Sequence, residues 1–140
     1  MLVLMKTDKK RDKNKIRILQ EFKRKYRQLT SKYSPQINAL VNRFYSESSS
    51  IDSKINHAIG LEEEYDRFLE DFSNLEIPSF LDFAYSCELD HLNREKEFYN
   101  GFPNFLNHNL LNIISSKSET SNMNFLRELN KLDKNLQLII

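Results

Sequence analysis

Apolar residues recur every three or four positions over residues 51–75, which is the spacing of one face of an α-helix. The residues that share this face are Ile51, Ile55, Ala58, Leu61, Tyr65, Phe68, Phe72 and Leu75. Three serines at 48–50 precede the stripe, and a serine hydroxyl at that point satisfies a free N–H group of a first helical turn. The pattern predicts an amphipathic helix that starts after Ser50 and ends near Leu75.

A second apolar stripe with the same spacing lies upstream. Its residues are Ile16, Leu19, Phe22, Tyr26, Leu29 and Tyr33, followed by Ile37, Leu40, Val41 and Phe44. Pro35 interrupts this stripe, and because proline lacks an N–H it either kinks a helix or starts a new one. The polar residues at 46–50 allow the chain to reverse. We therefore expect an antiparallel, coiled-coil-like hairpin of about 13–46 and 50–75.

Three shorter helices are expected after the hairpin. The first covers about 80–99, the second opens at Pro103, and the third covers 123–136, with the polar stretch at 115–122 as a loop between the last two. The predicted fold is an all-α bundle. Its parts are a disordered basic leader (1–12), the hairpin with the third helix (13–100), and C-terminal short helices on the same bundle (101–140).

Composition supports this fold class. The chain has 140 residues with only 2 Gly and 3 Pro, which disfavours a turn-rich all-β fold. A single cysteine, Cys87, cannot form an intramolecular disulfide. The chain shows no secretory signal and no apolar run of roughly 20 residues, so we expect an intracellular protein, cytoplasmic or nuclear, without a membrane span.

The formal net charge of +1 conceals a strong segregation of charge. Residues 1–32 carry twelve Lys and Arg against three acids, whereas 47–97 carry fourteen acids against four bases. One interpretation places the basic stripe of 13–27 against the acidic stripe of 52–71 within the hairpin. The other leaves it exposed to bind nucleic acid or an acidic partner. A membrane surface is disfavoured because the apolar face of that helix already packs on 51–75. The candidate binding residues are Lys10, Lys13, Arg17, Arg24 and Arg27.

Few residues suggest catalysis or metal binding. Glu88 and His91 have the spacing found in di-iron bundles, but such a site needs a second Glu-x-x-His, and neither His57 nor His108 follows a glutamate at that spacing. Cys87 and His91 share a helical face without further zinc ligands. Glycine-rich phosphate loops are absent from the sequence. We therefore expect no enzyme activity, no cofactor and no metal.

Aromatic residues are dense between positions 80 and 105, more than a small core needs, so some are expected at a protein interface. The residues expected to be exposed are Phe83, Phe102, Leu138, Ile139 and Ile140. The sequence thus predicts a non-enzymatic helical interaction module, an adaptor or structural subunit whose partners are other protein subunits, with homo-oligomer formation open. The alternative is nucleic-acid or ribonucleoprotein binding through the basic N-terminal helix.

Overall fold

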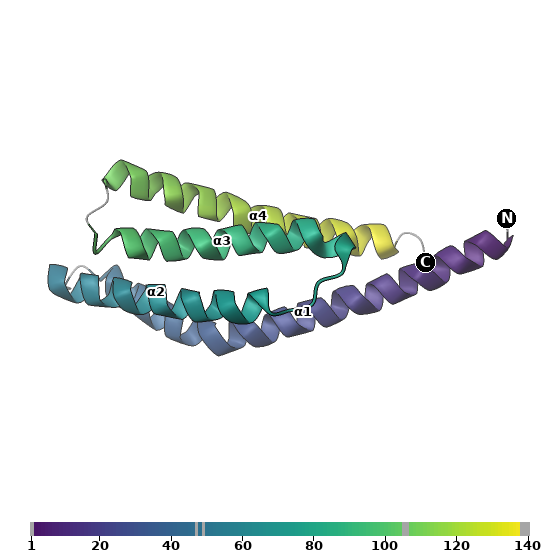
Figure 1. Cartoon of the computed structure of the whole chain (residues 1–140), viewed down its shortest axis with the longest axis horizontal. Helices are drawn as coiled ribbons and strands as arrows, with labels where there is room; N and C mark the ends of the chain where they lie inside the picture. The colour runs from purple at the N-terminus through teal and green to yellow at the C-terminus, as the bar shows by residue number, and fades with distance from the viewer. Residues whose placement is uncertain (1, 47, 49, 105–106, 138–140) are drawn as a thin grey trace.

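The computed structural model describes residues 2–46, 48, 50–104 and 107–137, and within these ranges it describes side chains from Lys13 to Leu136. The described chain is all-α, as predicted. Its elements are α1 (Leu2–Phe44), α2 (Ile51–Ser73), the short 3₁₀ helix η1 (Ser79–Leu81), α3 (Asp82–Gly101) and α4 (His108–Gln137). Successive helices lie side by side in alternating directions, and α4 returns to contact α1, which gives an up-down-up-down bundle (Figure 1).

Helix α2 begins where the serine pattern predicted. The Ser50 hydroxyl accepts a hydrogen bond from the Ser53 N–H at 3.1 Å, so Ser50 is the N-cap. The helix ends at Ser73, and the next residues lead through Pro78 into η1. The expected amphipathic helix is therefore present, with its C-terminal end close to the predicted Leu75.

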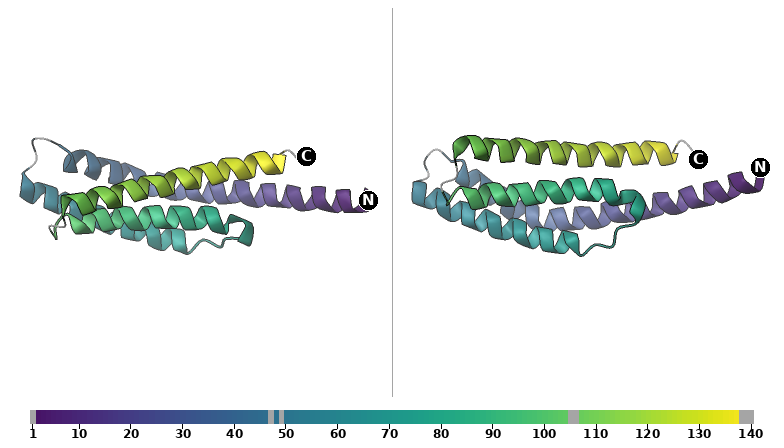
Figure 2. Two further views of the ribbon diagram at one scale, coloured as in Figure 1. Left: turned by 90° about the horizontal axis from the view of Figure 1, so that it is seen from above. Right: turned by 45° about the horizontal axis from the view of Figure 1, so that its top comes forward.

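Helix α1 passes through Pro35 without a break, so a fresh start at that residue is excluded. Figure 1 shows that α1 bends along its length, as expected of a helix whose interior contains a proline. The helix begins at Leu2, and its N-terminal part extends past the ends of the other helices (Figure 2). That residues 1–12 form a disordered leader stays a prediction.

The C-terminal part differs from the expectation. The short helix from Pro103, the loop at 115–122 and the last helix from 123 are replaced by one continuous helix, α4. It starts after Asn107, whose side chain accepts from the Asn109 N–H at 2.8 Å. The polar residues of 115–122 fit inside the helix because their side chains find partners. Thr120 bonds the Ser116 carbonyl one turn back, and Ser118 and Ser121 bond α3.

Aromatic side chains from all four helices meet at the centre of the bundle. Phe22 and Tyr26 of α1 have ring centroids 6.5 and 5.1 Å from that of Phe125 of α4. Phe72 of α2 stacks on Tyr85 of α3 at 4.8 Å. Each buried side chain of this size contributes roughly 1.5–3 kcal/mol, so this cluster is a main source of cohesion.

Candidate functional sites on α1 and between α3 and α4

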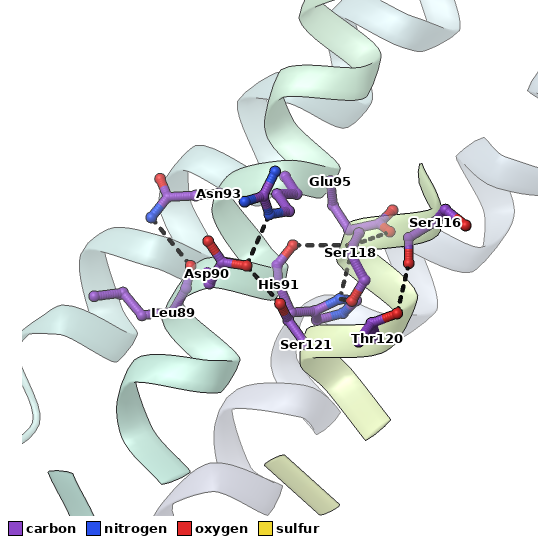
Figure 3. Close-up of polar contacts among 10 residues, drawn as sticks. Leu89, Asp90, His91, Asn93, Glu95, Ser116, Ser118, Thr120 and Ser121 are labelled. Atoms are coloured by element: carbon purple, nitrogen blue, oxygen red, sulfur yellow. Dashed lines mark hydrogen bonds and ion pairs between the residues drawn. The ribbon is translucent and has the colours of Figure 1, made fainter. Parts of the chain in front are cut away.

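A row of polar side chains lies between α3 and α4, and we name it the polar seam. It consists of Glu88, Asp90, His91 and Glu95 of α3 with Ser118, Ser121 and Asn122 of α4. Helical spacing places Glu88, His91 and Glu95 along one side of α3, opposite the serines and asparagine of the antiparallel α4, and Asp90 reaches Ser121 from the flank of this side. Figure 3 shows how the central part of the seam is joined.

Ser118 is the centre of the seam. Its hydroxyl donates to Glu95 Oε1 at 2.6 Å, and the His91 Nδ1 atom lies 2.9 Å from Ser118 Oγ (Figure 3). A serine, a histidine and a carboxylate suggest hydrolytic chemistry, but Ser118 is only 1% exposed. A substrate cannot reach its oxygen, so this arrangement holds the two helices together instead of presenting a nucleophile.

Among the described Asp, Glu, Lys and Arg side chains, Glu88 is the most deeply buried, with an exposed fraction of 1%. Its carboxyl group accepts from the Tyr26 hydroxyl of α1 and from Asn122 Nδ2 at 3.3 Å. Burial raises the pKa of Glu88 to about 8, and the nearby Glu95 adds to the shift while the Asn122 hydrogen bond opposes it. Glu88 is therefore mostly protonated at neutral pH.

The geometry disfavours the metal-binding interpretations of this region. Glu88 turns to Tyr26 and Asn122, whereas His91 turns to Ser118, so the two do not point at a common centre. Within the described residues no group of three or more His, Cys, Asp and Glu side chains could hold a metal ion. Cys87 is half-buried, and burial raises the pKa of its thiol above its usual value.

Four of the five predicted binding residues on α1 have described side chains, and all four are exposed. We call Lys13, Arg17, Arg24 and Arg27 the basic face. Arg17 donates to Asn14 Oδ1 at 2.7 Å, and Arg24 pairs with Glu21 on the same helix. The side chain of Lys10 lies outside the described residues.

The acidic residues of α2 do not cover this basic face. In the described part of the chain, the ion pair between α1 and α2 is Lys32 with Asp71, beyond the basic face. Asp66 instead pairs with Lys96 of α3 at 2.7 Å, and Glu62 accepts from Asn100 of α3 at 3.0 Å. Among the described residues, the expected pairing of the basic stripe with the acidic stripe of α2 is not found, and Glu62 and Asp66 of α2 bond α3 instead.

The residues predicted to lie at a protein interface differ in their exposure. Phe83 is 60% exposed, as expected. Phe102, expected to be exposed, is instead half-buried, because its ring packs edge-on against that of Phe44 of α1, with the ring centroids 4.8 Å apart. Leu138, Ile139 and Ile140 lie outside the described residues. The structure adds exposed apolar residues that the pattern assigned to the core or did not single out, which are Tyr45, Ile51, Ile59, Leu110, Ile113, Met123 and Leu126.

A groove lies between α1 and the segment that connects α2 to η1, and no sequence pattern predicted it. It has a volume of about 320 Å³, and its apolar lining consists of Ile18, Phe22, Leu75 and Pro78. Arg17 also lines it, so the groove adjoins the basic face. Sequence spacing cannot reveal such a groove, because its two walls come from distant parts of the chain.

No protein-family model, curated protein or solved structure matches this chain. None of the described helices is both long enough and apolar enough to cross a membrane. The function is therefore inferred from the geometry of these sites.

Proposed function

We propose that this protein is a non-enzymatic helical interaction module, an adaptor or structural subunit of a larger protein assembly, that binds an acidic surface of its partner through α1. The observation that carries the proposal is the basic face. Its four cations are exposed, and none of them forms an ion pair with another helix in the described part of the chain. In this proposal α1 and α2 act as an antiparallel, coiled-coil-like hairpin that presents these cations.

The polar seam supports the non-enzymatic part of the proposal. The side chains best suited to chemistry bond one another inside the bundle, and Ser118 and Glu88 are almost completely covered. Catalytic groups must instead reach a substrate through a cleft. Self-association of this module stays a prediction, and light scattering of the purified protein over a concentration series would test it.

Nucleic-acid binding is the alternative, and the same exposed cations favour it. Phosphate contacts would make such binding weaken steeply with salt, without dependence on sequence. The groove beside the basic face favours a protein partner, because its lining is largely apolar and a phosphate backbone has no group to fill it.

The test compares two variants that remove the same charge. In the first, Lys13, Arg17, Arg24 and Arg27 all become Gln, which removes the basic face. In the control, the exposed cations of α4, Lys117, Arg127, Lys131 and Lys134, become Gln. The probes are a labelled acidic peptide rich in Asp and Glu, a labelled duplex and a labelled single strand, each titrated at low and at physiological salt.

We expect the acidic peptide to bind the natural chain and the control variant, and to bind the basic-face variant at least tenfold more weakly. Equal losses in both variants would mean that net charge, and not this face, determines binding. If only the nucleic acids bind, and lose affinity in the basic-face variant, the alternative replaces the proposal. If no probe binds at low salt, the basic face is not a binding site.

A further inference from the structure

The groove between α1 and the α2–η1 connection has a size and lining suited to holding one side chain. Its volume of about 320 Å³ is at the small end of the range of ligand pockets, so it has room for a bulky side chain more readily than for a large cofactor. The apolar lining comes from Ile18 and Phe22 on one wall and from Leu75 and Pro78 on the other. Filling it with an apolar group would remove this surface from water.

The charged side chains that line the groove differ in whether they already have a partner. Glu21 is engaged by Arg24 of the same helix, and this hydrogen bond lowers the pKa of Glu21. Arg17 bonds the neutral amide of Asn14, and Lys25 forms no ion pair among the described residues. Two cations on the α1 wall are thus available to an incoming anion, whereas the opposite wall contributes Glu76. An acidic segment is favoured along the α1 side of the groove.

The walls of the groove are held in place without a ligand. The ammonium group of Lys15 lies 5.7 Å from the centre of the Phe80 ring, which ties α1 to η1. Leu81 is completely buried, and the Tyr85 hydroxyl donates to the Phe72 carbonyl at 3.4 Å. These contacts fix the connecting segment at both ends. A preformed groove costs little ordering when a ligand binds.

We propose that this groove receives one bulky apolar side chain, such as phenylalanine or leucine, from an acidic segment of the partner protein, while carboxylates of the same segment pair with Arg17 and Lys25. This inference rests on the proposed function, since it specifies the acidic partner that the basic face binds. The cations supply attraction and orientation, and the apolar side chain supplies specificity among acidic segments.

The experiment uses two labelled peptides rich in Asp and Glu that have the same charge and differ only at one central residue, Phe in one and Ser in the other. Both are titrated into the full chain by fluorescence anisotropy. The groove variants are Leu75→Asp and, as a milder change, Ile18→Ser. The control is Phe83→Ser, which removes an exposed apolar side chain outside the groove. Circular dichroism checks that each variant is folded.

We expect the Phe peptide to bind the natural chain about tenfold or more tightly than the Ser peptide, the effect of burying one large apolar side chain. The groove variants should abolish this preference, and Phe83→Ser should keep it. Equal binding of both peptides to the natural chain would overturn the groove proposal while leaving the basic face as a binding site. A preference that survives both groove variants would place the apolar contact elsewhere and would also overturn it. Binding of neither peptide would overturn this proposal together with the proposed function.

Discussion

The two helix pairs of this bundle are joined by different chemistry. Between α1 and α2 the contacts are mainly apolar and aromatic, as where Tyr33 stacks on Phe68 at 5.2 Å and Leu40 packs closely over Gly60. Between α3 and α4 a partly buried row of hydrogen bonds, centred on the buried Ser118, accompanies the apolar contacts. Apolar contacts are non-directional, whereas hydrogen bonds require one alignment of donor and acceptor. The first pair therefore contributes mostly cohesion, and the second also selects a register.

The largest expected effect comes from removing a buried aromatic side chain from the apolar contacts of α2. Phe72 of α2 is completely buried, and its ring meets those of Phe22, Tyr26 and Tyr85. Phe72→Ala should lower the free energy of unfolding by about 3–5 kcal/mol, because it leaves a cavity where three helices meet. Urea denaturation followed by circular dichroism measures this. The matched control, Phe83→Ala on the surface, should change it by about 0.5 kcal/mol or less.

The next effect concerns Glu88 and pH. In the unfolded chain its pKa is near 4.5, and burial raises the pKa to about 8 in the folded protein. The folded state thus binds the proton more tightly, so the contribution of Glu88 to stability is complete below pH 4.5 and is lost as pH rises through 8. Glu88→Gln keeps the shape and removes the titration. It should make the protein more stable than the natural chain at about pH 9, by about 2–3 kcal/mol.

Denaturation midpoints of both proteins at acidic, neutral and alkaline pH test this prediction. The natural chain should lose stability relative to Glu88→Gln as pH rises above 4.5, and the two should be similar at about pH 4.5 and below. Parallel curves for the two proteins over the whole range would mean that a group other than Glu88 is responsible for the pH dependence.

Ser118→Ala probes the polar seam without changing charge. The substitution removes the hydroxyl that bonds Glu95 and leaves the His91 ring with the Ser118 carbonyl alone. We expect a loss of about 1–2 kcal/mol in the free energy of unfolding, since buried polar groups lose a partner. Ser116→Ala, at an exposed position on the same helix, serves as the control. Because alanine is the better helix former, Ser116→Ala should leave the free energy of unfolding unchanged or raise it slightly. An equal loss in both variants would mean that the contacts of Ser118 are not the cause of the loss.

The smallest expected effect is at the edge of the α1–α2 contact. The Tyr33 hydroxyl, and then Lys32, hold the pKa of Asp71 below its usual value of 3.8. Its contribution to stability is therefore present above pH 3.8 and is lost as pH falls through the lowered pKa. Asp71→Asn should cost at most about 1 kcal/mol near neutral pH. The difference between the two proteins in thermal denaturation should shrink in acid; a constant difference would contradict this assignment.

The sequence predicted the elements that depend on local patterns. The stripe of 51–75 and the serine cap at Ser50 lead directly to α2, because a helix and its first turn are determined by neighbouring residues. The stretch 115–122 was wrongly predicted to be a loop because only its local pattern was considered. Its serines and asparagine favour a loop locally, but Ser118, Ser121 and Asn122 have partners on α3 that spacing alone does not reveal.

The candidate sites also depend on contacts between helices that spacing alone does not reveal. The sequence shows that residues 13–27 are basic. Which helix lies beside the acidic residues of α2 depends on how the four helices pack. Asp66 pairs with Lys96, a residue that charge segregation had grouped with the acidic middle of the chain. The groove likewise combines Ile18 with Leu75, two residues predicted to belong to different helices.

The order of the helices in space has a consequence for folding speed. Each helix packs on the one that follows it in the chain, and α4 also returns to contact α1 (Figure 1). A further long-range contact among the described residues joins Tyr26 of α1 to Glu88 of α3. Contacts between residues close in sequence need little loop closure, and helical proteins of this kind fold in microseconds to milliseconds. The chain should therefore reach its native state rapidly, with the junction of Phe125 and Tyr26 among the most costly in entropy to form.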